Sequence, residues 1–107
     1  MELKIIHFYP DLMSLYGSYA NVSVLRRYLE ALGCAVTVQA VVPGEGADIT
    51  GADFLFMGAG TERAQRFAAE DFARYSATVK AAAEDGTAML FAGTAMAVSY
   101  THLTLPT

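Results

Sequence analysis

The chain has no tryptophan and only one cysteine, Cys34, among its 107 residues. A single cysteine excludes an intramolecular disulfide framework and a cysteine-based zinc site. No apolar run approaches the roughly 20 residues that span a bilayer, and the segment before Pro10 lacks the small-residue cleavage site of a secretory signal. We therefore expect a cytoplasmic location, no membrane span, and neither a metal ion nor a cofactor.

Positive charge is also scarce, with seven Lys and Arg against eleven Asp and Glu, which gives a net charge of −4. Because nucleic-acid binding needs a concentrated basic surface and these cations form no cluster, we expect no nucleic-acid partner. Apolar residues, in contrast, make up 54% of the chain and charged residues 17%. In one small domain, or part of a larger one, this balance indicates either strands buried on both faces or an apolar surface that awaits a partner.

The hydrophobic pattern predicts alternating strands and helices. Short apolar runs bounded by Pro and Gly predict strands at residues 3–9, 35–42, 53–57 and 88–91. Apolar residues at helical spacing predict helices over 21–32 and 61–85. Strands of continuous apolar character are typical of parallel sheets covered on both faces. We expect an α/β, flavodoxin-like three-layer fold whose four parallel strands have the order 2-1-3-4.

Residues at both ends of the first predicted helix indicate where it begins and ends. Asn21 is expected to cap its beginning and Gly33 to end it. Its buried stripe, at the spacing i, i+3, i+4, i+7, is predicted to consist of Leu25, Tyr28, Leu29 and Leu32. The strand that follows alternates, which suits a sheet edge, and its apolar face is predicted to carry Val36, Val38, Ala40 and Val42.

The second helical region is predicted to begin after Thr61 and to end at Gly86, with a possible break near Phe67. One face of it carries apolar residues at helical spacing, and we expect these to be buried against the sheet: Ala68, Phe72, Tyr75, Val79 and Ala82.

Ligands of such sheets bind at the carboxyl ends of the strands. Three segments are predicted to meet at that edge: residues 9–11, 58–61 and 92–94. The third has the outline of a nucleophile elbow, a sharp strand-to-helix turn that exposes the attacking residue beside N–H groups that bind an oxyanion. Its elbow position is Ala92, whose methyl group cannot attack a carbonyl carbon. The sequence therefore predicts an elbow without a nucleophile.

The turn from Gly58 through Ala59 and Gly60 to Thr61 has two interpretations. Its N–H groups could bind an anion at the start of the following helix, although the spacing and the missing lysine do not match a phosphate-binding loop. The simpler interpretation is a tight strand-to-helix turn that needs glycine for a positive φ. From this motif alone the simpler interpretation is preferred.

Other residues are weaker candidates. Thr94 has no evident base to activate it, and the turn from Ala92 through Gly93 could merely pack strand against helix. Cys34 precedes the predicted edge strand, far from the carboxyl edge, and is expected to be a buried small hydrophobe. His7 is expected to be a hydrogen-bonded core or near-surface histidine. Three residues of the first loop and helix could contact a ligand or partner, although loop packing explains them equally well: Tyr16, Tyr19 and Asn21.

The last segment, residues 97–107, breaks the pattern. A helix should follow the elbow, yet this stretch is rich in Thr, Val and Tyr and contains Pro106, all poor helix formers. We expect residues 1–96 to belong to the domain and 97–107 to be an irregular tail, produced by truncation or by read-through of foreign sequence. His102 lies in this tail and is given no role.

Three segments, in the right order, resemble the amidotransferase subunit of lipid II isoglutaminyl synthase, the GatD-type class I glutamine amidotransferases related to cobyric acid synthase (CobB/CobQ-type). They are residues 11–26 (DLMSLYGSYANVSVLR), 53–65 (DFLFMGAGTERAQ) and 84–92 (EDGTAMLFA). Their combination is more specific than any one of them. The resemblance implies that residues 1–96 form the N-terminal half of such a domain.

The resemblance also implies a function. In this family a cysteine at the elbow forms a glutamyl thioester, a downstream histidine activates it, and backbone N–H groups hold the oxyanion. The ammonia released from glutamine passes to a Mur-ligase-like partner, which amidates the D-glutamate of peptidoglycan precursors. Carried over to this chain, the nucleophile position is Ala92, the oxyanion donors are Gly60 and Gly93, and further candidates are Gly58, Ala59 and Thr94.

This chain departs from the family pattern at the elbow. The cysteine is absent, and Gly93-Thr94-Ala95-Met96 replaces the Gly-Gly-Tyr-Gln that usually follows it. Ser18 and Ala20 stand where the first loop usually has aspartate and glycine, and the histidine half lies outside the chain. We therefore expect no glutamine hydrolysis. The alternatives are a non-catalytic subunit that binds a ligase partner and a generic flavodoxin-like binder of small molecules.

Overall fold

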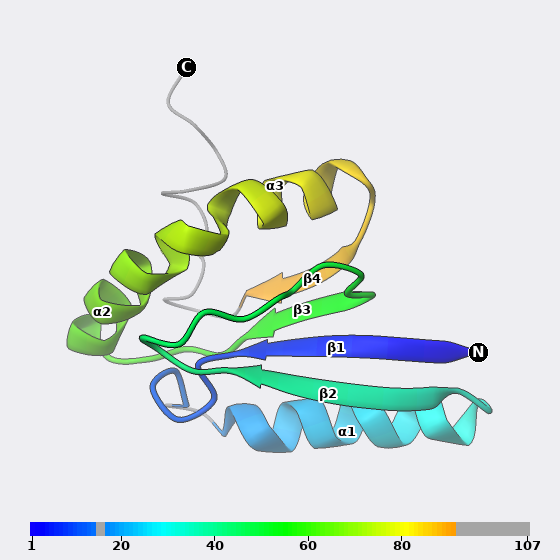
Figure 1. Ribbon diagram of the computed structural model, residues 1–107. Coiled ribbons are helices and arrows are strands. Elements are labelled where there is room, and N and C mark those ends of the chain that lie inside the picture. Colours follow the sequence, from blue (N-terminus) through cyan, green and yellow to red (C-terminus); the bar gives the residue numbers. More distant parts are fainter. Residues whose placement is uncertain (15–16, 92–107) are drawn as a thin grey trace.

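The computed structural model describes residues 1–14 and 17–91. Its four strands form one sheet in the order β2-β1-β3-β4, and every neighbouring pair is parallel (Figure 1). The strands are β1 (Glu2–Phe8), β2 (Ala35–Val41), β3 (Phe54–Met57) and β4 (Ala88–Phe91). The predicted α/β class, flavodoxin-like sheet and strand order are confirmed, and no strand limit differs from its predicted position by more than one residue.

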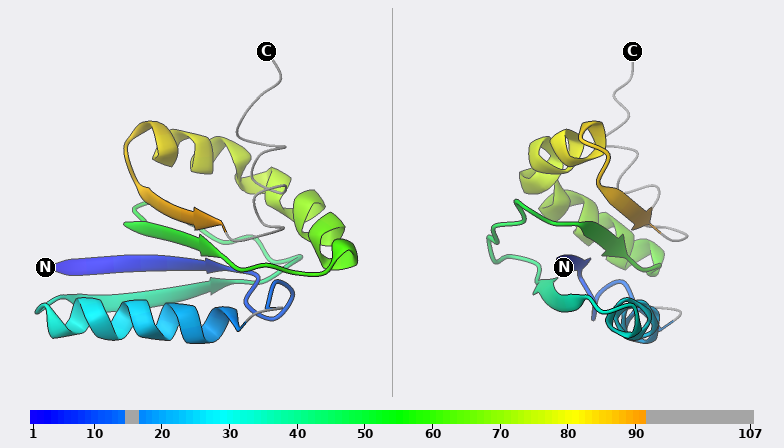
Figure 2. Two further views of the ribbon diagram at one scale, coloured as in Figure 1. Left: turned by 180° about the vertical axis from the view of Figure 1, so that it is seen from behind. Right: turned by 90° about the vertical axis from the view of Figure 1, so that its right-hand side faces the viewer.

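Helices cover the sheet on opposite faces. Helix α1 (Ser18–Ala31) lies on one face, whereas α2 (Glu62–Phe72), the 3-10 turn η1 (Ala73–Tyr75) and α3 (Ser76–Glu84) lie on the other (Figures 1 and 2). The crossover from β1 to β2 and the crossover from β3 to β4 step across the sheet in opposite directions. Because such crossovers are right-handed, their helices must lie on opposite faces.

Two hydrophobic cores follow from this arrangement. On the α2–α3 face, Ile6, Phe8 and Met57 pack against Phe72 and Val79, all of them fully buried. The smaller core, on the α1 face, joins strand residues to the helix and consists of Ile5, Val22, Val36 and Phe56. Neighbouring strand residues therefore point to opposite cores, which explains why β1 and β3 are apolar without interruption.

Helix α1 begins earlier than predicted and buries a different stripe. Its N-cap is Gly17, in the left-handed conformation with φ 75°, and not Asn21. The buried stripe contains Val22 and the partly buried Leu25 and Leu29, whereas the predicted members Tyr28 and Leu32 are 63% and 64% exposed. The periodicity was predicted correctly, but only contact with the sheet decides which side of the helix is buried.

The end of α1 agrees with the prediction. The N–H of Gly33, whose φ is 93°, donates to Glu30 O, and the N–H of Cys34 donates to Leu29 O. This pair of bonds is a Schellman motif, in which glycine adopts the left-handed conformation at low cost. Gly86 ends α3 in the same way, as predicted.

The second helical region buries the predicted face but breaks elsewhere. Phe72, Tyr75 and Val79 are buried, together with Ala68, and Ala82 is partly buried. The interruption is η1, at Ala73–Tyr75, and Phe67 lies inside α2 with 56% of its surface exposed. The predicted break at Phe67 is therefore wrong, because an exposed aromatic residue interrupts the apolar periodicity without interrupting the helix.

The two edge strands differ from the prediction in their burial. In β2 the expected apolar face is buried at Val36 and partly buried at Val38, but Ala40 and Val42 are exposed. In β4, Ala88 and Leu90 are exposed, although cover on both faces was expected. Within the described residues, α1 lies beneath β1 and β2, and no element covers the same face of β4.

Candidate functional site

The carboxyl ends of three strands meet where the sequence predicts the site. Phe8 pairs with Met57, and Met57 pairs with Phe91, and these residues are the last of β1, β3 and β4. The segments that begin at Tyr9 and Gly58 therefore leave the same edge of the sheet. Ala92 is next in sequence after Phe91. The predicted elbow residues and tail, however, lie outside the described residues: Ala92, Gly93, Thr94, residues 97–107 and, in the first loop, Tyr16.

The loop from Gly58 to Gly60 is buried, together with Ala59 between them. Among the described glycines, positive φ values occur at Gly17, Gly33, Gly44, Gly51 and Gly86. The expected reason for glycine in this loop, a positive φ, is therefore wrong.

Close packing explains the glycine at position 60. A Cβ atom on Gly60 would lie 2.5 Å from Sδ of Met13 and 3.3 Å from both Leu12 O and the Cβ of Ala64. Real Cβ atoms do not approach a neighbour as closely as the first of these distances. Glycine is therefore needed here because the turn after β1 packs directly on the loop after β3.

Helix α2 starts immediately after this loop. Thr61 is its N-cap, as predicted, and Oγ1 of Thr61 accepts a hydrogen bond of 3.2 Å from the N–H of Ala64. The N-terminus of a helix carries partial positive charge and unpaired N–H groups, which favour an anion. The arrangement of a buried glycine loop and a helix start is therefore suited to hold negative charge at this edge of the sheet.

The turn after β1 has a strained beginning. Tyr9 has φ 51° and is the only described residue other than glycine with a positive φ. Its N–H donates to Val41 O and its carbonyl accepts from the N–H of Met13, both at 2.8 Å. The side chain of Tyr9 is fully buried. Strained backbone of this kind persists only where the surrounding structure holds it in place.

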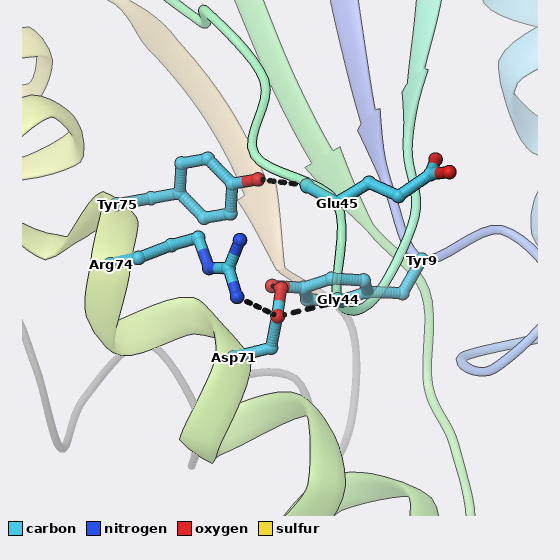
Figure 3. A network of polar contacts seen from close by, with 6 residues as sticks. All are labelled: Tyr9, Gly44, Glu45, Asp71, Arg74 and Tyr75. Carbon is cyan, nitrogen blue, oxygen red and sulfur yellow. Dashed lines mark hydrogen bonds and ion pairs between the residues drawn. The ribbon is translucent and has the colours of Figure 1, made fainter.

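A buried polar network holds Tyr9 in place (Figure 3). The Tyr9 hydroxyl donates to Oδ2 of Asp71 at 2.7 Å, and the Gly44 N–H donates to Oδ1 of the same carboxylate at 2.9 Å. Arg74 forms an ion pair of 3.0 Å with Asp71, and the hydroxyl of Tyr75 donates to Glu45 O. Burial, reinforced by the hydrogen bond to Asp71, raises the pKa of the Tyr9 hydroxyl, which therefore remains a donor.

The sequence analysis placed Tyr9 at this edge, within residues 9–11, but missed Asp71 and the hydrogen bond that joins the two. Asp71 is 8% exposed and stands three residues after Ala68 and four before Tyr75, on the predicted buried face of the helix. A carboxylate on a buried helix face needs partners. The position of Asp71 on a face predicted to be buried was therefore the sequence signal that could have identified a buried polar network.

His7 occupies the α1 face of β1. It is 2% exposed and lies between the rings of Tyr19 and Phe56, at centroid distances of 5.5 and 5.3 Å. Its Nε2 has no hydrogen-bond partner among the described residues, so the expectation of a hydrogen-bonded histidine is wrong for that atom. Burial lowers the pKa of the imidazole, and the nearby Asp11 opposes this shift.

Similarity to known proteins agrees with the expectation from the sequence. The lipid II isoglutaminyl synthase (glutamine-hydrolyzing) subunit GatD of Staphylococcus aureus strain N315 is 32% identical over 85 residues, which are 79% of this chain and 35% of that protein. The GatD subunit of Streptococcus pneumoniae strain ATCC BAA-255 / R6 is 36% identical over 70 residues, 65% of this chain and 27% of that protein. The chain is similar to GatD. It spans about a third of the length of these relatives, and no protein-family model matches it.

The remaining candidates lie away from this edge of the sheet. Cys34 is partly buried, packs against the smaller core and directly precedes β2, so it stands at the opposite edge of the sheet, as expected. Within residues 1–14 and 17–91, no group of three or more His, Cys, Asp or Glu side chains could hold a metal ion. None of the helices in these ranges is long and apolar enough to cross a membrane.

Proposed function

We propose that this chain belongs to a GatD-like amidotransferase subunit that has lost the hydrolysis of glutamine. The observation that carries the proposal is the pairing of Met57 with Phe91 at the ends of β3 and β4. The Gly58–Gly60 loop follows Met57 in sequence, and residue 92 follows Phe91, so both come directly after a pair of neighbouring strand residues. An oxyanion loop and a nucleophile must come from neighbouring positions of this kind. Residue 92 is alanine.

The chemistry explains why alanine removes the activity. A cysteine thiolate would attack the side-chain amide of glutamine, and the resulting oxyanion would accept hydrogen bonds from N–H groups before ammonia leaves and a thioester remains. We assign the donor role to Gly60 and Gly93, with Gly58, Ala59 and Thr94 beside them. The methyl group of Ala92 has no lone pair of electrons, so it cannot attack the amide carbon. Loss of a covalent nucleophile costs about 10⁶-fold in kcat in a well-studied serine protease.

Cys34 does not replace the missing thiol. It stands before the first residue of β2, whereas the loop that would hold the oxyanion follows the last residue of β3. The two positions lie at opposite ends of a parallel sheet, so a substrate at the glycine loop would not reach the Cys34 sulfur.

The proposed role is therefore to bind a partner. The similar GatD proteins are named as subunits of a glutamine-hydrolyzing lipid II isoglutaminyl synthase, and we propose that this chain occupies the corresponding place beside a Mur-ligase-like subunit. That subunit would amidate the D-glutamate of a peptidoglycan precursor. Ammonia would then come from solution or from an active parent enzyme that uses glutamine. The large apolar fraction of the chain favours such a partner.

Glutamate release tests the loss of hydrolysis. The chain is incubated with glutamine, alone and together with a Mur-ligase-like candidate partner from the same organism, and glutamate is measured. We expect no release above the buffer rate in either sample, and robust turnover would contradict the proposal. In parallel, the chain is expected to copurify with the ligase; a chain that remains free would contradict the partner role.

Covalent labelling tests the position of residue 92. A glutamine-like diazoketone alkylates a thiol and releases N₂, so it reports a thiol that is placed to attack glutamine. We expect the reagent, which the oxyanion loop would hold beside residue 92, to label the introduced thiol of Ala92→Cys faster than Cys34 of the unchanged chain, without help from the histidine that activates the cysteine in the family. The matched variant Ala92→Ser controls for the substitution itself. Equal labelling of both thiols would mean that residue 92 does not stand at an elbow.

A further inference from the structure

We infer that Tyr9 is a positioning residue for the Gly58–Gly60 loop. Tyr9 fixes the turn formed by residues 9–13, and Met13 and Leu12 of this turn fix Gly60. Its importance for chemistry rests on the proposed function, which places this loop beside residue 92 as an oxyanion loop; because Ala92 begins no reaction, the effect on chemistry is measured in the Ala92→Cys background. The coupling itself is a property of the described residues and can be tested separately.

The first step is the anchoring of Tyr9. Three hydrogen bonds fix it: its hydroxyl bonds Asp71 in α2, its N–H bonds Val41 at the end of β2, and its carbonyl bonds Met13. Asp71 is itself held by Gly44 and Arg74. Since the φ of Tyr9 is 51°, a conformation that an L-residue adopts at a cost, the hydroxyl bond helps to keep the backbone there.

The second step is the contact between the turn and the loop. The Met13–Tyr9 hydrogen bond closes the turn, and the side chain of Met13 is fully buried. Its sulfur lies 2.5 Å from the place of a Cβ on Gly60, and Leu12 O lies 3.3 Å from the same place. There is no room for the turn to move toward the loop. Because packed interiors transmit displacements, a shift of the turn must also shift Gly60.

The consequence for chemistry follows from the burial of the loop. Gly58, Ala59 and Gly60 are buried, so the segments packed against this loop decide where its N–H groups point, and at Gly60 one of those segments is the turn that contains Leu12 and Met13. Oxyanion donors work only when they are preorganised at the right place. We therefore assign this task to the 9–13 turn and, through it, to the hydroxyl of Tyr9.

The network contains its own control. Tyr75 is also a buried tyrosine, and its hydroxyl donates to Glu45 O in the same network. That bond ends on Glu45, in the loop between β2 and β3, and not on the turn. Tyr9→Phe and Tyr75→Phe thus remove the same chemical group from neighbouring positions, but only the first removes a bond made by the turn itself, so it should disturb the turn more.

Nuclear magnetic resonance of the ¹⁵N-labelled chain tests the coupling. We expect the amide resonance of Gly60 to shift about threefold or more further in Tyr9→Phe than in Tyr75→Phe, because only the former releases the turn that packs on it. Met13→Leu keeps the anchor and alters the contact, so it should also shift Gly60, even if Tyr9→Phe does not fold. Equal shifts in the two tyrosine variants, or an unmoved Gly60 in Met13→Leu, would overturn the inference.

The diazoketone reaction supplies a functional readout. In the Ala92→Cys background, Tyr9→Phe is expected to slow labelling of the introduced thiol about tenfold, less than the roughly 10²–10³-fold cost of removing an oxyanion donor because here the donor is only displaced, whereas Tyr75→Phe changes the rate less than about twofold. Equal rates in both variants would overturn the positioning role. If the thiol is labelled in no variant, the elbow of the proposed function fails, while the shifts of Gly60 still decide the coupling.

Discussion

The imidazole ring of His7 meets the phenol ring of Tyr19 edge-on, with the ring planes 72° apart. Tyr19 belongs to the first turns of α1, and its hydroxyl donates to Oδ1 of Asp11 at 2.9 Å. Tyr19 thus covers a buried histidine of β1 and at the same time ties the helix to the turn after that strand. The start of α1 therefore packs directly on His7.

Acid is expected to destabilise the fold through His7. Burial lowers the pKa of this imidazole in the folded protein below its ordinary value of 6.5, whereas the unfolded chain keeps that value. Between these two pKa values the unfolded state binds the proton more readily than the folded state. The contribution of His7 to the free energy of unfolding is therefore constant above about pH 6.5 and falls as the pH drops toward the folded-state pKa. Asp11 is the charged group that faces His7, and it limits the loss without cancelling it.

Urea unfolding between about pH 5 and pH 8 checks this prediction. His7→Leu should remove the acid sensitivity in that window and cost little stability at neutral pH, because the Nε2 that it removes has no partner among the described residues. Tyr19→Phe keeps the ring and loses only the bond to Asp11, so it should keep the acid sensitivity. An unchanged slope in His7→Leu would assign the sensitivity to other groups.

Removal of the Asp71 carboxylate is expected to destabilise the fold strongly. Asp71→Ala leaves the Tyr9 hydroxyl and the Gly44 N–H without their acceptor, and the first of these donors is fully buried. We expect a loss of about 2–4 kcal/mol in the free energy of unfolding, measured by urea titration.

A surface aspartate provides the matched control. Asp48 also accepts two hydrogen bonds, both from Thr50, but it is exposed. Since water can replace an exposed acceptor, Asp48→Ala should cost less than about 1 kcal/mol. Similar losses in the two variants would mean that the buried network contributes no more than a surface turn.

The difference between two glycines gives a third prediction. Gly60→Ala places a methyl group against Met13 and Leu12, and we expect a loss of about 1–3 kcal/mol in the free energy of unfolding from overpacking. Gly46→Ala adds the same group where the nearest atom, in the Arg74 side chain, is 3.8 Å away. It should change the stability by less than about 0.5 kcal/mol. If Gly60→Ala is equally neutral, the turn does not pack on the loop.

Much of the fold could be predicted because its signals are local. Apolar strands, a helical apolar spacing and the stops at Gly33 and Gly86 together predicted the element order and a sheet order of 2-1-3-4. What could not be predicted was the side of each element that is buried. Tyr28 and Leu32 have the spacing of core residues, yet they face away from the sheet, because periodicity does not specify where the partner surface lies.

The site was harder to predict than the fold because its contacts are not local. Tyr9 and Asp71 are 62 residues apart in the sequence, and no motif around either residue predicts that the two are in contact. The role of Gly60 was obscured in the same way, since its reason is a contact with Met13 and not a property of its own backbone. Only the convergence of β1, β3 and β4 at one edge could be inferred, and this inference brought the ends of the correct strands together without the contacts between the segments that follow them.

An apolar groove lies between α1 and the β3–β4 pair. It agrees with one of the two interpretations of the composition, an apolar surface that awaits a partner. Its volume is about 460 Å³, and it is lined by uncharged residues that include Leu25, Tyr28, Phe54, Phe56 and Leu90. Leu90 is 51% and Tyr28 63% exposed. Patches of this kind attract apolar ligands, because water gains freedom when they are covered.

Binding of the fluorescent dye 8-anilinonaphthalene-1-sulfonate should report this groove. Leu90→Gln removes an apolar side chain from its wall, so we expect weaker dye fluorescence at a cost of less than about 1 kcal/mol in stability, since the residue is half exposed. Leu32→Gln is the control, because Leu32, the C-cap of α1, is also an exposed leucine but does not line the groove. If both variants reduce the fluorescence alike, the dye binds exposed leucines in general and the groove is not its site.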